Sequence, residues 1–162
     1  MESAGQITLL FHFIGLGLFV AIQVASFVIT SQYKKAPDLQ TKLTLLKVMR
    51  PIGLLSPIAI VVMIITGIGN MHAFQITLSD FSWLRTKLIV FGIAAVLGIV
   101  VGVLSRKRGA LVGMMVQGKA PADADAALKK YDRLIGALSL IMPLLLLCII
   151  YLSIYGRLGG QE

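Results

Sequence analysis

Four long apolar stretches occupy more than half of the chain and restrict its fold more than any other feature. They lie near residues 7–29, 52–68, 84–104 and 134–155. A helix needs roughly 17–25 apolar residues to cross the hydrocarbon core of a bilayer, and each stretch reaches or nearly reaches that length. We therefore predict an all-α membrane protein in which residues 1–162 form a single domain, an antiparallel four-transmembrane-helix bundle.

Positive charge lies almost wholly in two of the segments between these stretches. Residues 31–50 hold five of the 15 lysines and arginines, and residues 105–133 hold seven. On the opposite side, three basic residues are balanced by three acidic ones. Because loops rich in lysine and arginine stay in the cytoplasm, we predict that segments 31–50 and 105–133 are cytoplasmic and that both termini are extracytoplasmic.

Composition excludes a soluble domain. Mean hydropathy is +0.91 and only 14% of residues are charged, whereas about 25% are charged in soluble proteins. The net charge of +8 does not indicate nucleic-acid binding, because the basic residues border apolar spans, where topology and anionic headgroups account for them. We expect the lipid bilayer, and not a nucleic acid, as a partner.

Caps and helix breakers predict where the helices begin and end. Asp38 is placed to cap a short amphipathic helix, Leu39–Arg50, at the membrane interface, and the proline after it is expected to open the second span. Asp80 is placed to cap the third span. The segment Ser105–Lys119 is expected to be irregular, and a helical pattern from Ala124 to continue into the fourth span.

Small residues at four-residue spacing mark candidate helix contacts, because they let helix backbones approach closely in lipid. Packing within the bundle is the favoured interpretation, and a dimer face is the alternative. These residues are Gly17, Ala21 and Ala25 in the first span and Gly98 and Gly102 in the third.

Polar side chains share one stripe of the first span. At about 100° per residue, Gln23, Ser26 and Thr30 fall within roughly 40° of His12. Lipid cannot hydrogen-bond such groups, so the stripe is expected to face the protein interior. For all but His12 the favoured interpretation is interhelical hydrogen bonding, worth about 0.6 kcal/mol per pair.

His12 is the only ionisable residue well inside a span, which makes it a candidate metal ligand or proton carrier. The predicted topology brings further candidates to the same end of the bundle. For these further candidates the alternative roles are those of an interface anchor, of cations that snorkel to the headgroups, or of ordinary loop residues. They are Met71, His72, Trp83, Arg85 and Lys87.

Other site motifs are absent from the sequence. It has no nucleotide-binding loop, HExxH, GxSxG or CxxC motif, and no acidic residue inside a span. Cys148 is the only cysteine, which excludes an intrachain disulfide. No catalytic residue is assigned, and whether the protein is an enzyme stays open.

Several short motifs follow one another in a recognisable order. They are Leu10-Phe11-His12-Phe13-Ile14-Gly15, then Ser56-Pro57-Ile58-Ala59 running to Thr66-Gly67-Ile68-Gly69, then Trp83-Leu84-Arg85-Thr86-Lys87-Leu88, and finally Arg106-Lys107-Arg108. This order, over roughly residues 8–108, resembles the CopD-like and HemJ-like small bacterial membrane proteins and related families of unknown function.

The HemJ-like resemblance implies a haem b site that serves protoporphyrinogen oxidation. By that resemblance His12 and Lys87 form the haem-proximal pair, with Trp83 beside them and Arg85 nearby. The chain departs from that family after the first span, where it lacks the family's arginine and histidine. The CopD-like resemblance implies copper uptake, for which His12, Met71 and His72 are the candidate metal ligands.

Three hypotheses follow for this protein, which the resemblance assigns to the bacterial cytoplasmic (inner) membrane. The first is a protein that binds haem b or a similar redox ligand near the outer face of the bundle, held by His12 with Lys87 or His72 opposite. The second is a non-enzymatic accessory subunit of a larger membrane complex, for which a stable homo-oligomer is the competing partner. The third is a copper-handling protein.

Overall fold

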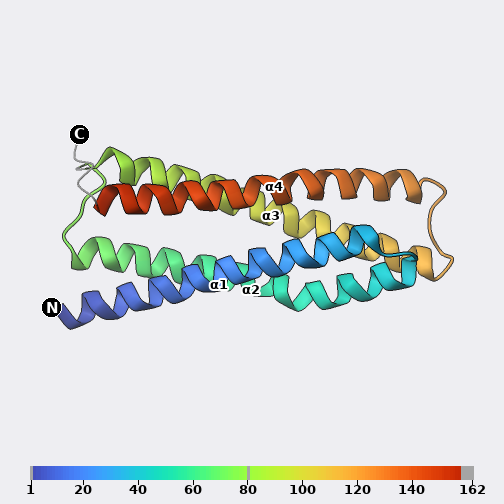
Figure 1. Ribbon diagram of the computed structural model, residues 1–162, viewed down its shortest axis with the longest axis horizontal. Coiled ribbons are helices and arrows are strands. Elements are labelled where there is room, and N and C mark those ends of the chain that lie inside the picture. Colours follow the sequence, from blue (N-terminus) through green and yellow to red (C-terminus); the bar gives the residue numbers. More distant parts are fainter. Residues whose placement is uncertain (1, 80, 158–162) are drawn as a thin grey trace.

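The computed structural model describes residues 2–79 and 81–157, and within these ranges the side chains of residues 5–79 and 81–156. It consists of four antiparallel helices (Figure 1). Their bounds are α1 Glu2–Lys35, α2 Leu39–Ala73, α3 Ser82–Val116 and α4 Ala124–Arg157. Each contains a window whose mean hydropathy is between 2.2 and 2.8, and each is long and apolar enough to cross a membrane. The predicted all-α four-helix bundle is confirmed, and the protein is a multi-pass membrane protein.

Two of the predicted helix boundaries are wrong. Leu39–Arg50 is not a separate helix, because α2 continues through Pro51 and Pro57 to Ala73. Proline is tolerated inside membrane helices when water or neighbouring groups bond the carbonyls that it leaves free. Ser105–Lys119 is not irregular either, because α3 continues to Val116, and its lysines and arginines are good helix formers.

The helix pattern from Ala124 is confirmed, since α4 runs unbroken from Ala124 to Arg157. The cap at Asp38 is confirmed as well. Its carboxylate accepts hydrogen bonds from the Thr41 backbone N–H at 2.7 Å and from the Thr41 hydroxyl at 2.9 Å, and these bonds hold the pKa of Asp38 below its ordinary value of 3.8. The predicted cap at Asp80 lies outside the described residues.

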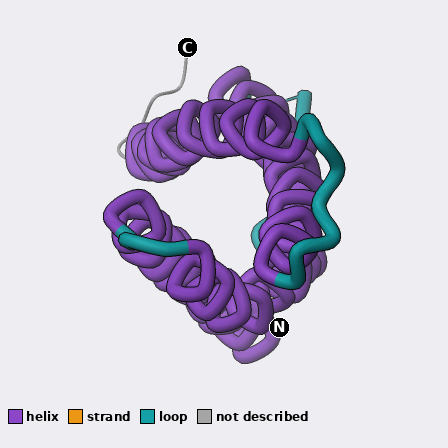
Figure 2. The backbone as a smooth tube through the Cα atoms, turned by 90° about the vertical axis from the view of Figure 1, so that its right-hand side faces the viewer, coloured by secondary structure: helices purple, strands orange, loops and turns teal. Residues whose placement is uncertain are grey.

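The four helices form two hairpins. α1 packs mainly against α2, and α3 mainly against α4, whereas α1 barely contacts α4. Viewed along its length the bundle is an incomplete ring (Figure 2). We call the end that carries the α1–α2 and α3–α4 loops the basic end. The opposite end, where α1 begins and α4 finishes, is the terminal end (Figure 1).

Two apolar clusters join the hairpins. The middle cluster brings together residues of α1, α2 and α4, and the cluster at the basic end takes residues from all four helices. The middle cluster consists of Phe19, Ile22, Ala59, Met63, Met142 and Leu146, and the basic-end cluster of Tyr33, Leu46, Leu111, Val112, Ala124 and Leu128.

Close packing of α1 on α2 depends on a glycine other than those predicted. A Cβ added to the buried Gly15 would lie 3.1 Å from side-chain atoms of Val62 and Met63. The same atom on Gly17 or Gly102 would meet nothing within 4 Å. The prediction that the small-residue faces pack within the bundle is therefore wrong at Gly17 and Gly102, which are exposed on the outside of their helices.

Candidate functional site

His12 is anchored to α2 by a hydrogen-bonded threonine. Its Nδ1 lies 2.9 Å from the hydroxyl oxygen of Thr66, which is only 8% exposed. The same hydroxyl donates to the backbone carbonyl of Val62 at 2.6 Å. Because its proton is directed to that carbonyl, the hydroxyl acts as an acceptor toward the imidazole, so Nδ1 is the donor, which in a neutral imidazole places the lone pair on Nε2.

The local sequence of α2 makes this contact possible. Thr66 follows Val62 by four residues, so its hydroxyl reaches the carbonyl one helical turn back. The ring also lies beside Gly67, where an added Cβ would be in ordinary van der Waals contact, 3.7 Å from Cε1 of His12. The half-buried imidazole therefore lies in the α1–α2 contact.

The rest of the predicted polar stripe also faces inward. Thr30 is buried, and Gln23 and Ser26 are half-buried. The side chains of their neighbours Val24, Phe27 and Val28 are at least half exposed, so α1 presents its apolar side to lipid. The orientation predicted for the stripe is confirmed.

The two candidate copper ligands beyond His12 lie at the end of α2. Met71 is half-buried and His72 is exposed. His72 follows Thr66 by six residues, which is about 9 Å along the helix axis. Among the described residues, no group of three His, Cys, Asp or Glu side chains could hold a metal ion, and copper handling stays a prediction.

Trp83 belongs to the other hairpin. Its indole ring lies against the backbone of Gly156 in α4, so closely that a Cβ added to Gly156 would overlap the ring. Phe81 packs beside it, with ring centroids 5.8 Å apart. The indole Nε1 is buried and has no hydrogen-bond partner among the described residues. Trp83 is thus a packing residue of the α3–α4 hairpin at the terminal end.

Arg85 and Lys87 lie on the first turns of α3. Arg85 is exposed, and Lys87, one turn beyond Trp83, is half-buried. The sequence-predicted site residues lie in the first part of α1, the last turns of α2 and the first turns of α3, which are all toward the terminal end, but the described contacts attach His12 to α2 and Trp83 to α4. The pairing of His12 with Lys87 stays a prediction.

Sequence reasoning missed a polar cluster at the basic end, which we call the arginine node. Arg108 of α3 is only 1% exposed. Its guanidinium carbon lies 4.4 Å from the ring centroid of Tyr33 in α1, and its Nη1 lies 3.3 Å from a carboxylate oxygen of Asp132 in α4. Lys42 of α2 completes the node, with Nζ 5.5 Å from the same ring centroid. All four helices thus contribute one member.

The arginine node is incompletely satisfied. The buried Nε and Nη2 atoms of Arg108 have no hydrogen-bond partner among the described residues, and the hydroxyl of Tyr33 faces Asp132 without a hydrogen bond of full geometry. Cation–π contact with Tyr33 stabilises the face of the guanidinium but uses none of its N–H groups. Two N–H-bearing atoms of Arg108 are therefore buried without a hydrogen bond.

A signal for the node was present in the sequence. Arg108, Leu111, Val112 and Met115 follow the i, i+3, i+4, i+7 pattern of one helix face, which continues beyond the third span into the basic segment. Only the concentration of charge made that segment resemble a loop.

Comparisons with known proteins add no family to these observations. No protein-family model matches the chain, and no curated protein or solved structure matches it either.

Proposed function

We propose that this multi-pass membrane protein binds a haem-type redox ligand at its terminal end, which Nε2 of His12 would hold. The observation that supports this is the hydrogen bond from His12 Nδ1 to Thr66. Metal-ligating histidines usually donate their second ring N–H to a neighbouring acceptor, which fixes the tautomer and makes the ligand nitrogen more basic.

The donor set suits such a group. His12 supplies an imidazole at the edge of an apolar span, and Lys87 on α3 or His72 on α2 is the candidate for a second ligand. The exposed guanidinium of Arg85 suits the carboxylate groups of a haem. When bound, a b-type haem supplies one-electron chemistry, and the protein sets its axial ligand and the polarity around it.

An absorption spectrum of the protein, purified in detergent from haem-supplemented cells, tests this proposal. We expect a Soret band that His12→Ala abolishes, that either Lys87→Met or His72→Ala shifts, according to which of the two lies opposite His12, and that the exposed control Arg106→Gln at the basic end leaves unchanged. A wild-type protein without the band, or a band that survives in His12→Ala, would refute haem binding. Metal analysis of the same preparations after copper loading tests copper handling. If Met71 and His72 are ligands, replacing them should lower the copper content of the protein.

A role as a subunit of a membrane assembly is the second candidate. It is supported by Gly17 and Ala21 on α1 and Gly102 on α3, which are exposed at a spacing that favours helix–helix association. If this is correct, a stoichiometric partner should co-purify with the wild type, and Gly17→Leu should lower its yield. A wild-type protein that purifies without a partner, as a monomer or as a stable, isolated homo-oligomer, would contradict it.

We also propose that the protein lies in the bacterial cytoplasmic membrane with both termini outside. The support is the charge of the basic end, which holds most of the lysines and arginines. Single cysteines at Lys34 and Ser79, in a Cys148→Ser background, test it. An impermeant thiol reagent added to intact cells should label only the cysteine at Ser79, and labelling of the cysteine at Lys34 alone would reverse the orientation.

A further inference from the structure

The described residues do not fully compensate the buried positive charge of the arginine node. A guanidinium removed from water is destabilising unless it is paired and its N–H groups are hydrogen-bonded. Arg108 is almost completely buried, yet its one ionic hydrogen bond, to Asp132, is 3.3 Å long. Charge-assisted bonds of this kind are usually about 2.7–2.9 Å long, so Asp132 satisfies Arg108 only in part.

The unsatisfied edge of Arg108 has a specific shape. Nε and Nη2 carry two roughly parallel N–H bonds on one side of the planar group, and both atoms lack a partner among the described residues. This fork matches two oxygens of a phosphate or carboxylate. Asp132 contacts Nη1 instead, so the fork is left for another anion.

Two neighbouring residues, Tyr33 and Lys42, also favour a bound anion. The hydroxyl of Tyr33, on the ring that stacks on Arg108, is a further buried group; it faces the carboxylate of Asp132 but makes no hydrogen bond of full geometry to it or to any other described residue. Lys42 brings a second positive charge to that ring. With two cations and one carboxylate, the node carries a positive surplus that one bound anion would neutralise.

The depth of the node in the membrane indicates which anions can reach it. Arg108 follows the end of the predicted third span by four residues, or about 6 Å, and Asp132 precedes the predicted fourth span by two residues. This depth corresponds to the headgroup layer, which adds about 5–8 Å to each side of the hydrocarbon core. Phospholipid phosphates lie in this layer, and dissolved anions also enter it.

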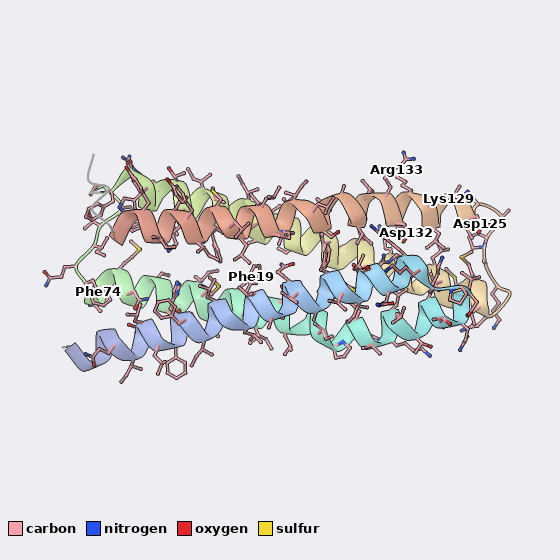
Figure 3. The ribbon with its side chains drawn as sticks, viewed as in Figure 1. Phe19, Phe74, Asp125, Lys129, Asp132 and Arg133 are labelled. Carbon is pink, nitrogen blue, oxygen red and sulfur yellow. The ribbon has the colours of Figure 1, made fainter. Side chains whose placement is uncertain are left out.

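The outer side of α4 is positive at the same depth. Lys129, Lys130 and Arg133 are exposed and line a hollow with Ala126 and Leu134. Figure 3 shows Asp132 on the inner side of α4 and Arg133 on its outer side. A local excess of positive charge raises the concentration of anions at the surface next to the node.

We propose that Arg108, together with Tyr33 and Lys42, binds a phosphate group, carried either by an anionic phospholipid or by a free phosphate. The fork of Arg108 holds two phosphate oxygens, and the Tyr33 hydroxyl donates to one of them. The inference is independent of His12, which lies toward the opposite end of the bundle, so it stands or falls separately from haem binding.

Thermal unfolding of the full chain in an uncharged detergent tests the proposal, because a ligand that binds only the folded state raises the midpoint. Three probes are added separately: phosphatidylglycerol, inorganic phosphate, and diacylglycerol as a lipid without phosphate. We expect a concentration-dependent rise with at least one phosphate probe and none with diacylglycerol. A rise with phosphatidylglycerol alone identifies the lipid, and a rise with inorganic phosphate identifies the phosphate group itself as sufficient.

Variants attribute the effect to the node. Arg108→Lys keeps the charge but loses the fork, so it should bind at least tenfold more weakly, whereas the exposed control Arg106→Gln should bind like wild type. Tyr33→Phe keeps the stacked ring and removes one donor, which should weaken binding about fivefold. If Arg108→Lys does not fold, Tyr33→Phe decides the question.

Two results would overturn the site. One is a wild-type protein that neither phosphate probe stabilises. The other is an affinity that Arg108→Lys, or Tyr33→Phe in its place, leaves unchanged, since the phosphate would then bind elsewhere, for example at the exposed cations of α4.

Discussion

The two ends of the bundle differ in which helices their contacts join. At the terminal end two described contacts each join the helices of one hairpin: His12 bonds Thr66 across α1 and α2, and Trp83 packs on Gly156 across α3 and α4. At the basic end the arginine node takes one residue from each helix. A change at the basic end should therefore weaken the whole bundle, and a change at the terminal end should remain within one hairpin.

Breaking the ion pair of the node should have the largest effect. Asp132→Ala leaves the Arg108 charge buried without its carboxylate, which for fully buried pairs costs about 3–5 kcal/mol. The Asp132 side chain is 31% exposed, so we expect about 2–3 kcal/mol here, measured as a shift in denaturant unfolding followed by circular dichroism.

A double variant is the control for this prediction. Arg108→Met combined with Asp132→Leu removes both charges and keeps apolar volume, so it should destabilise the bundle less than Asp132→Ala alone. If the double variant were the less stable of the two, the carboxylate would not be compensating a buried charge, and the distinction between the two ends would weaken.

At the terminal end, Gly156→Ala should disturb only the α3–α4 hairpin. The added methyl group would overlap the indole of Trp83, so the ring or the last turn of α4 must move, at about 1 kcal/mol. Trp83 is the only tryptophan, so its fluorescence emission should shift. Gly102→Ala, where nothing lies within 4 Å, should leave the emission unchanged, and an equal shift in both variants would contradict the prediction.

Hydropathy was sufficient to predict the bundle, because a bilayer allows few alternatives for a chain with four long apolar stretches. It was not sufficient to predict helix ends. The helices have 34 or 35 residues, or about 51 Å at 1.5 Å per residue, so each extends well beyond the hydrocarbon core of about 30 Å. Charge marks where the apolar span ends, and the helix itself continues through the headgroup layer.

Of the two candidate sites, the sequence likewise predicted one, around His12, and missed the other, around Arg108. The inward stripe of His12 was predicted because a polar group inside an apolar span is conspicuous. Arg108 was not, because it lies among other basic residues, and only its register with Leu111 and Val112 distinguishes it from exposed neighbours such as Arg106. The partner of His12, Thr66, could not be identified from sequence either, since the contact depends on how α1 is rotated against α2.

Thr66→Val should have a smaller effect, confined to the α1–α2 hairpin. Valine keeps the shape of the side chain and removes the hydroxyl that accepts from His12 Nδ1. Interhelical hydrogen bonds in membranes contribute about 0.6 kcal/mol on average and at most about 1.7, so stability should fall within that range. Imidazole ¹⁵N spectra should show the Nδ1–H tautomer in wild type and in Thr66→Ser, and a mixture of tautomers in Thr66→Val.

The smallest effect should come from Asp38, which caps α2 from an exposed loop at the basic end. Hydrogen bonds from Thr41 lower its pKa from 3.8, so the carboxylate stabilises the first turn fully above that pH and loses its effect as the pH falls through the lower folded value. Amide exchange at Thr41 and Lys42 should therefore become faster, relative to the rest of α2, as the pH is lowered through this range. Asp38→Asn keeps an acceptor that does not titrate, so its relative protection should not change with pH. If the relative protection of the wild type did not change with pH, the arginine node, which holds Lys42 against Tyr33, would order this turn without the cap. The contact among all four helices would then stabilise the basic end as far as the first turn of α2.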